Sequence, residues 1–316
     1  ELMSRPPRIH TDYLTPTNAN LLSVALLGGS TDHYLDPHPF SSLLPQGYHL
    51  VYFPPAHPTA SLLPDGTDTD HSPGSPFTRR VWAGGSVTFH RGWEEEVVLD
   101  GAVAGCLETI KDVRIKGTPG AGEKILVDIV RQYGWRQIAH EMRQQRLDGA
   151  SGAECVMAEP AIEETRTLCF MTPKTADEAR RDVEEPHRRV IKAPAYEPTY
   201  TLTLTPTPSL LFRFSALTFN AHAIHLDRQH CREVEGYRDL LVHGPLLLTL
   251  MFCALREAIK CHAKETLRIK TLDYRNLAPV YVNEEIKVCV REGKGQNWDV
   301  WIVGPTGGLC VKGTAI

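Results

Sequence analysis

The sequence predicts an α+β fold in which a curved antiparallel sheet wraps around one central helix. Residues 246–263 are strongly apolar and have the length of a buried helix. Gly307-Gly308 makes a hairpin turn, and strand-like runs surround that turn at 267–274, 285–290, 298–303 and 309–315. An antiparallel meander must cover its apolar face, and this helix is the only element available to cover it. These observations predict a hot-dog fold.

The second half begins with the strand and the turn that lead into this helix. Residues 199–204 alternate between polar and apolar side chains, the pattern of a half-buried strand. A His243-Gly244-Pro245 turn opens the helix, and proline suits a first helical turn because its missing N–H costs nothing there. Between the strand and the turn, residues 211–227 crowd polar side chains into an apolar run. This run carries most of the chemistry that the chain predicts.

The sequence of the first half predicts the same order of elements, with a weaker candidate for the central helix. Residues 17–27 indicate a short helix that Gly28-Gly29 would end. Residues 135–146 fit either a helix or a strand. The remaining pattern is mostly strand, with predicted strands at 86–89, 97–99, 125–130 and 165–171.

Two stretches of the first half are irregular. Residues 36–77 are rich in proline, and a loop of this length is often a lid or a wall of a site, with disorder at 59–76 as the alternative. Residues 178–189 carry mixed charges and lead to Pro194 and Pro198, which predicts a linker. The predicted domains are therefore 1–190 and 191–316.

Composition narrows the function class. The 316 residues are 42% hydrophobic and 23% charged, with a formal net charge of −4, and the pI is about 6.4. This charge predicts no nucleic-acid partner and no general attraction to anionic membranes. No apolar run approaches the ~20 residues that span a bilayer.

The eight cysteines form no Cys-x-x-Cys pair, which predicts reduced, mostly buried thiols. Arg5 and Arg8 are too few to indicate a transit peptide, and Asp12 argues against one.

The polar run resembles a known family. Residues 214–227 together with Val242-His243-Gly244-Pro245 resemble the MaoC-like, (R)-specific enoyl-thioester hydratases and dehydratases. Residues 80–86 and 274–279 match further motifs of the fungal mitochondrial 3-hydroxyacyl-thioester dehydratase type 2 group. The resemblance spans nearly the whole chain. It implies a double hot-dog, with a degenerate N-terminal unit and a catalytic C-terminal unit.

The family signature is a variant in this chain. The signature runs small residue, Gly, Asp, any, Asn, Pro, aliphatic, His. His225 takes the place of its histidine and Ile224 that of its aliphatic residue. Asn220 stands where the family has aspartate, His222 where it has asparagine, and Phe219 where it has glycine. The form found here also resembles the branch that hydrates mesaconyl- or itaconyl-type CoA esters.

The resemblance implies acid/base chemistry next to a thioester carbonyl. His225 is the only motif residue that titrates near neutral pH, and Asn220 can orient water or a hydroxyl by hydrogen bonds. We hypothesise that His225 shuttles the proton while Asn220 positions the oxygen. Asp227 is predicted either to orient His225 or to supply the missing carboxylate. The Gly244 N–H, at a helix N-terminus, is the predicted donor to the enolate oxygen.

Further residues are predicted to contact the substrate. Arginines suit a substrate carboxylate or a pantetheine phosphate, although each is also explained as a surface or structural residue. For His222, His230 and His243 a structural role is favoured. A zinc site made by His222, His225 and His230 is not predicted, because no acidic or Cys ligand lies at a recognisable spacing. The predicted substrate-binding residues are Arg213, Phe219, His243, Arg228, Arg80 and Trp82.

The leading functional prediction is a lyase of fatty acid metabolism that interconverts a 3-hydroxyacyl thioester and a trans-2-enoyl thioester. The substrate is carried on CoA or acyl carrier protein, no cofactor is implied, and a homodimer is compatible with the family. One alternative is a pathway-specific hydratase of a branched or dicarboxylic thioester. Others are a hot-dog that binds acyl thioesters without turnover, because the aspartate is absent, and a thioesterase. The resemblance implies a mitochondrial location, with the cytoplasm as the alternative.

Overall fold

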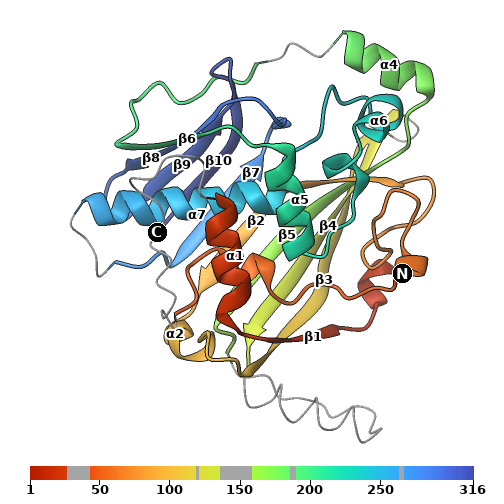
Figure 1. The fold of residues 1–316 in the computed structure, drawn as a ribbon. Helices are drawn as coiled ribbons and strands as arrows, with labels where there is room; N and C mark the ends of the chain where they lie inside the picture. The colour runs from red at the N-terminus through yellow and green to blue at the C-terminus, as the bar shows by residue number, and fades with distance from the viewer. Residues whose placement is uncertain (27–42, 119–120, 136–158, 186–189, 263–266) are drawn as a thin grey trace, which may run out of the picture.

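The computed structural model describes residues 1–26, 43–118, 121–135, 159–185, 190–262 and 267–316. One ten-stranded sheet, in the order β1-β3-β4-β5-β2-β7-β10-β9-β8-β6, forms the body of the molecule (Figure 1). Every neighbouring pair is antiparallel. The strands are β1 (Arg8–Tyr13), β2 (Arg79–Phe89), β3 (Val103–Thr118), β4 (Ala121–Gly134), β5 (Ile162–Met171), β6 (Tyr200–Leu204), β7 (Thr271–Asn276), β8 (Ile286–Glu292), β9 (Trp298–Val303) and β10 (Leu309–Ala315).

The sheet contains the same arrangement twice. Its first half runs β1-β3-β4-β5-β2 and its second, read from the other edge, runs β6-β8-β9-β10-β7. In both halves the second strand in sequence lies at the centre of the molecule. The halves join where β2 pairs with β7, from Gly84 opposite Arg275 to Thr88 opposite Thr271. The predicted double hot-dog fold is therefore confirmed, while the boundary at residue 190 remains a prediction.

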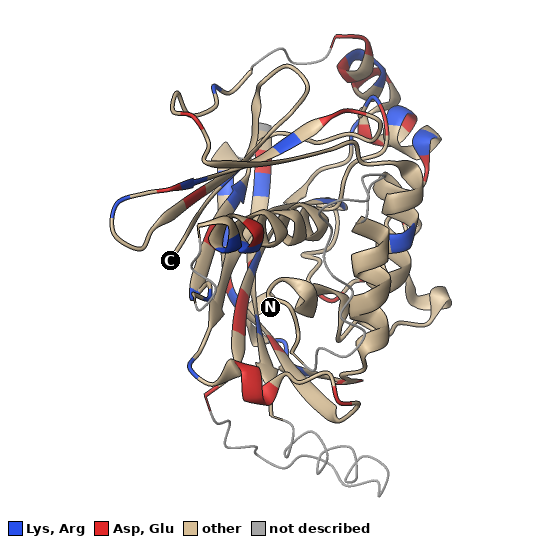
Figure 2. Cartoon of the chain, turned by 60° about the vertical axis from the view of Figure 1, so that its left-hand side comes forward, with Lys and Arg blue, Asp and Glu red and all other residues tan. Residues whose placement is uncertain are grey.

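The predicted central helix is α7 (Gly244–Cys261), and Pro245 lies in its first turn. Twelve of its residues are buried, because it contacts β2, β6, β8 and β9 on the concave face of the sheet. Its charged residues lie at its C-terminal end, as Figure 2 shows. The other helices are α1 (Pro16–Leu26), α2 (Trp93–Glu96), α4 (Ala176–Glu184), α5 (Pro208–Leu217) and α6 (Arg228–His230), with short helical turns at Leu2–Ser4, Tyr48–Val51, Thr59–Ser61, Ala223–His225 and Cys231–Glu235.

The first repeat has no counterpart of α7 among the residues that the structure describes. Between β1 and β2 they contain the shorter α1 and an irregular segment, residues 43–77. Residues 48–53 of that segment are buried against the first half of the sheet. Residues 36–42 of the predicted proline-rich loop lie outside the described residues, and the described part contributes a wall of a cavity, with Leu62, Asp68 and His71 among its lining residues.

Two predictions need correction, and two strands were missed. Residues 97–99 are not a strand; they follow α2, and only Val98 pairs, in an isolated bridge with Leu43. Much of the predicted linker is helix α4, which begins with a capping box between Thr175 and Glu178. The strands β1 and β3 were not individually predicted. The ambiguous run 135–146 and the glycine stop at 28–29 lie almost wholly outside the described residues.

No described helix combines the length and the apolar character that a membrane crossing requires. The seven described cysteines form no disulfide, and all except Cys261 are buried. The predicted buried thiols are confirmed for these residues.

Candidate active site

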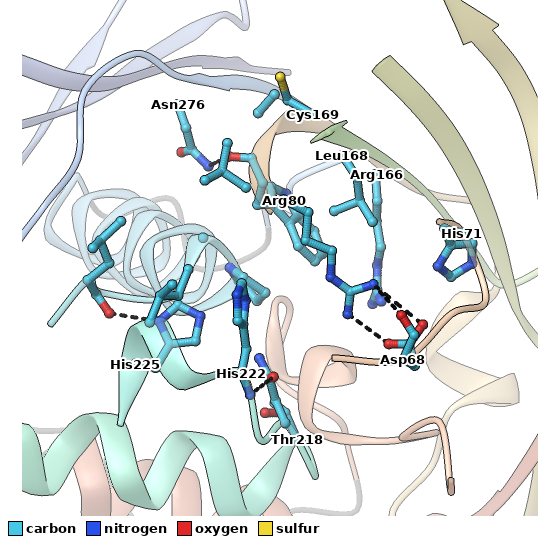
Figure 3. Close-up of a pocket in the computed structure, with 18 of the residues that line it drawn as sticks. Asp68, His71, Arg80, Arg166, Leu168, Cys169, Thr218, His222, His225 and Asn276 are labelled. Carbon is cyan, nitrogen blue, oxygen red and sulfur yellow. Dashed lines mark hydrogen bonds and ion pairs between the residues drawn. The ribbon is translucent and has the colours of Figure 1, made fainter. Parts of the chain in front are cut away.

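A cavity of about 490 Å³ lies between the two repeats. The second repeat lines it with the loop after α5 and the first turn of α7. The first repeat lines it with the irregular segment and with strands β2 to β5. Figure 3 shows His222 and His225 facing the cavity from one side and Arg80 and Arg166 from the other. The cavity therefore combines the predicted catalytic motif with a wall from the other half of the chain.

The motif loop is held in one conformation by its own hydrogen bonds. Thr218 ends α5 and its hydroxyl donates to the Phe214 carbonyl. Phe219 adopts a left-handed φ of 52°, and the Asn220 side-chain oxygen accepts from the His222 N–H at 3.0 Å. The Ala223 N–H donates to the Asp65 carbonyl at 2.8 Å. The irregular segment of the first repeat is thus hydrogen-bonded to the motif loop of the second.

His225 is a buried imidazole with a fixed tautomer. Its Nδ1 lies 2.7 Å from the Leu241 carbonyl, and because a carbonyl only accepts, Nδ1 carries the hydrogen. Burial lowers the pKa of His225 to about 4, so the ring is neutral at physiological pH. Nε2, for which the described residues offer no hydrogen-bond partner, is the nitrogen that can take a proton.

Two more histidines pack around this ring. His243 stacks on His225 with ring centroids 3.6 Å apart, and its Nε2 shares a 2.8 Å hydrogen bond with the Ser215 hydroxyl. His222 meets His225 edge-on at 5.6 Å. Burial and the neighbouring His225 lower the pKa of both. The two rings pack against His225 and restrict its orientation.

Asn220 lines the cavity, and the oxygen of its side-chain amide already accepts a hydrogen bond. Its Oδ1 accepts the His222 N–H, so its Nδ2 is the group left to face a ligand. A primary amide has no titrating proton at useful pH. Asn220 can therefore donate a hydrogen bond to a water or hydroxyl oxygen but cannot serve as the base.

Gly244 lies where α7 begins, and it lines the cavity. The first backbone N–H groups of a helix have no partner within the helix. A Cβ at this position would lie 2.7 Å from Cβ of Trp82 and 3.1 Å from Nδ2 of Asn276. Glycine thus allows Trp82 and Asn276 to pack against the start of the helix, next to the N–H predicted to stabilise the enolate.

Replacing Gly244 with alanine is expected to destabilise the protein by about 1–3 kcal/mol, the usual cost of overpacking. Trp82 has little room to yield, because its Nε1 donates to the Tyr274 hydroxyl at 2.6 Å and its carbonyl accepts from Asn276 at 2.9 Å. Urea unfolding of wild type and variant measures the loss. An unchanged unfolding midpoint would contradict the close approach.

The structure brings only part of the predicted site together. His225, Asn220, Gly244, Phe219, Arg80 and Trp82 line the cavity. Four other predicted residues do not: Asp227, Arg213, Arg228 and His243. Asp227 is exposed and caps α6, because its carboxylate accepts the N–H groups of Gln229 and His230. It therefore neither orients His225 nor replaces the missing aspartate.

The other three residues lie outside the cavity lining for separate reasons. Arg213 is exposed on α5. Arg228 is exposed and pairs with Asp239 at 2.8 Å. His243 is completely buried and acts behind His225 rather than on a ligand.

Sequence reasoning missed the charged wall that the first repeat contributes. Its members come from the irregular segment and from alternate positions of β3, β4 and β5, and they are His57, Asp68, Asp70, His71, Glu108, Arg131 and Arg166. A charged residue within a predicted strand is a signal, but the sequence does not tell which face of the sheet that residue lies on. Asn276, from a matched motif, also lines the cavity.

Among the described residues, one group has the geometry of metal ligands: His57, Asp68 and Asp70. Its carboxylates already have cationic partners, since Asp70 pairs with Arg8 and Asp68 with Arg80, each at 2.8 Å. His57 bonds Asp70 at 2.7 Å. This donor set is satisfied within the protein and does not indicate a metal centre.

The chain matches the family model described as hydroxyacyl-thioester dehydratase type 2 over residues 47–282. It is 27% identical over 297 residues to "Hydroxyacyl-thioester dehydratase type 2, mitochondrial" of Schizosaccharomyces pombe, covering 91% of this chain and 90% of that protein. It is 29% identical over 248 residues to "Mesaconyl-C(4)-CoA hydratase" of Chloroflexus aurantiacus, covering 77% and 71%. A Saccharomyces cerevisiae protein with the same name as the first is 30% identical over 105 residues, 33% of this chain and 35% of that protein.

Solved structures share the fold over the whole chain. A MaoC-like dehydratase from Phytophthora capsici superposes with a TM-score of 0.64 at 14% identity, covering 100% of this chain and 96% of that one. HtdX of Mycobacterium tuberculosis gives 0.58 at 15% identity, covering 98% and 99%. At these identities the likeness concerns the fold alone.

Proposed function

This chain belongs to the hydroxyacyl-thioester dehydratase type 2 family, and from that premise we propose that it interconverts a 3-hydroxyacyl thioester and a trans-2-enoyl thioester, with His225 as the acid/base. Its relatives are lyases by name, a dehydratase and a hydratase. One observation carries the proposal. A neutral, orientated His225 and the N-terminal turn of α7 line the same cavity. A base and an oxyanion donor are the two groups that chemistry next to a thioester carbonyl requires.

The proposed mechanism uses one base for both protons. In hydration, Nε2 of His225 takes a proton from water, and the oxygen adds to Cβ of the enoyl thioester. The electron pair of the double bond moves to the thioester oxygen, where the Gly244 N–H stabilises the enolate. The imidazolium then returns the proton to Cα. Dehydration is the reverse, with His225 taking the Cα proton and delivering it to the leaving hydroxyl.

An absorbance assay tests the proposal. Purified protein is mixed with crotonyl-CoA, crotonyl-acyl carrier protein or mesaconyl-CoA, and loss of the enoyl-thioester absorbance is followed. Hydration of any of the three supports a hydro-lyase, and their relative kcat/KM values assign the carrier. No turnover together with measurable thioester binding would favour the alternative of a non-catalytic acyl-thioester-binding hot-dog.

Asn220 offers a second prediction about the same mechanism. Asn220→Ala should lower kcat/KM, because it removes the hydrogen bond that places the water, a contact worth about 1–3 kcal/mol when a buried partner is left unmet. Asn220→Asp should preserve or raise the rate, since it restores the family's carboxylate. Measuring kcat/KM for the three proteins on one substrate checks both. A wild-type rate in the alanine variant would make Asn220 structural only.

The finer assignments follow from the relatives. We propose a mitochondrial location because two relatives carry that word in their names, with the cytoplasm as the alternative. The CoA or acyl carrier protein thioester is the proposed partner, and a homodimer remains a prediction. A branched or dicarboxylic substrate is the second candidate, since one relative is a mesaconyl-CoA hydratase.

A further inference from the structure

The floor of the cavity on the side of the first repeat carries charged groups beside apolar side chains such as Leu50, Ile129 and Leu168. The sheet of this half is not covered by a long helix in the described residues, and the irregular segment covers only part of it. The space that remains is part of the cavity, and Arg131, Glu108 and Arg166 line it. Arg131 and Glu108 form an ion pair at 3.1 Å and are nearly completely buried. A ligand in this part of the cavity therefore lies against guanidinium and carboxylate groups.

Arg166 presents an open donor to this space. Its Nε and Nη2 are held in a fork by Glu164, at 2.7 and 2.8 Å, and Nη2 also donates to the Tyr133 hydroxyl at 3.2 Å. Its Nη1 is left without a hydrogen-bond partner among the described residues. Trp82 packs against the guanidinium, 5.0 Å from ring centroid to Cζ. Burial alone would raise the pKa of Glu164, but Arg166 beside it brings that pKa to about 2, so the ion pair is kept and the fork is fixed.

Arg80 lines the same cavity with its side chain 15% exposed. It donates through Nη1 and Nη2 to Asp68, the shortest contact being 2.8 Å, and its Nε has no partner among the described residues. Figure 3 shows both guanidinium groups extending toward Asp68, across the cavity from His222. Burial works against the charge of Asp68, but Arg80 holds the pKa of that carboxyl below its usual range. Each of the two guanidinium groups is thus already paired with one carboxylate, Arg80 with Asp68 and Arg166 with Glu164, and each keeps one N–H group that no described residue accepts from.

A long alkyl chain suits this floor poorly. It would cover the free N–H groups of Arg166 and Arg80 without offering an acceptor, and a buried polar group that loses water must find a partner. A carboxylate offers acceptors to both arginines in the geometry that guanidinium groups favour. We propose that the acyl group of the substrate ends in a carboxylate, which Arg166 and Arg80 bind. This inference rests on the proposed function and names the substrate class of that site.

Binding of saturated thioesters tests the proposal separately from turnover. Calorimetry on the wild-type protein compares matched pairs in which a terminal methyl is replaced by a carboxylate: butyryl- and succinyl-CoA, pentanoyl- and glutaryl-CoA, hexanoyl- and adipyl-CoA. Three acyl chain lengths are used so that in at least one of them the terminal carboxylate can contact the two arginines. In at least one pair the carboxylate should bind about tenfold tighter or more, the effect of one good charge-assisted pair. Equal or weaker binding of the carboxylate at all three lengths would overturn the proposal.

Paired variants test the residues. Arg166→Met with Glu164→Gln, and Arg80→Met with Asp68→Asn, each remove one arginine without leaving a buried carboxylate unpaired. Each should abolish most of the carboxylate preference, whereas Arg228→Met with Asp239→Asn, which removes an exposed pair outside the cavity, should keep it. Preference retained in both cavity variants would refute the assignment. If crotonyl- and mesaconyl-CoA are not hydrated but wild type still binds the carboxylate thioesters more tightly, the proposed reaction is wrong and the carboxylate site is supported. If crotonyl-CoA is hydrated but the carboxylate thioesters bind no more tightly, the proposed reaction is supported and the carboxylate site is wrong.

Discussion

His225→Ala is expected to lower kcat by at least about 10²-fold with the fold intact, the scale of losing a general acid/base. The imidazole is the group that exchanges protons in the proposed mechanism, and Asn220 cannot replace it. Alanine leaves a void beside His243, so the variant is compared with wild type at equal folded fraction, checked by circular dichroism. Turnover within a few-fold of wild type would remove His225 from the mechanism.

His243→Phe is the matched control. Phenylalanine keeps a ring against His225 and loses only the hydrogen bond to Ser215. Because His243 does not line the cavity, this variant should retain far more activity than His225→Ala. A loss as large as that of His225→Ala would show that His243 shares in the chemistry.

Acid is expected to destabilise the protein strongly between pH 6.5 and pH 4. Burial lowers the pKa of His49 and of His225 from 6.5 to about 4. Below pH 6.5 the unfolded chain gains protons on these rings that the folded chain does not bind, so stability present at neutral pH is lost as the pH falls toward 4. The expected loss at pH 5 is about 2 kcal/mol for each ring, or about 4 kcal/mol for the two. His222 and His243 shift in the same direction.

Urea unfolding at pH 7.5 and pH 5 measures this loss. His49 makes the better control, because it lies outside the cavity lining, edge-on to Tyr133 and Phe252, with neither ring nitrogen hydrogen-bonded. Its 3.8 Å approach to Glu164 does not offset burial, since that carboxylate is already paired with Arg166. His49→Phe should therefore reduce the loss of stability between pH 7.5 and pH 5 by about 2 kcal/mol, the contribution of one ring. Equal free energies of unfolding at the two pH values in wild type would show that these rings are not buried neutral.

The elements with a strong local pattern were predicted well. The apolar run at 246–263 is α7, displaced by two residues, because its sequence is apolar on all sides and a proline marks its start. Strand β9 has the predicted bounds. The run at 97–99 fails because three apolar residues are too short to indicate a strand when a helix precedes them.

Only the part of the site that lies within one short stretch of sequence could be predicted. His225, Asn220 and Gly244 are near in sequence and carry the family pattern, and they line one cavity. Asp227 is only two residues from His225, yet the helix that begins there turns its carboxylate to solvent as a cap. Arg166 and Glu108 lie on separate strands of the other repeat, and strand pairing rather than sequence proximity brings them to the cavity.

The pairing of β2 with β7 also limits how this molecule can change. A hinge between the repeats would have to break the backbone ladder from Gly84 to Thr88, so the two halves cannot rotate apart as independent domains do. In the proposed mechanism the chemistry lies on one repeat and much of the cavity wall on the other, so side-chain changes on β2 to β5 would alter which acyl group fits without disturbing His225. On the proposed function, the duplicated architecture would therefore let substrate specificity change independently of the catalytic group.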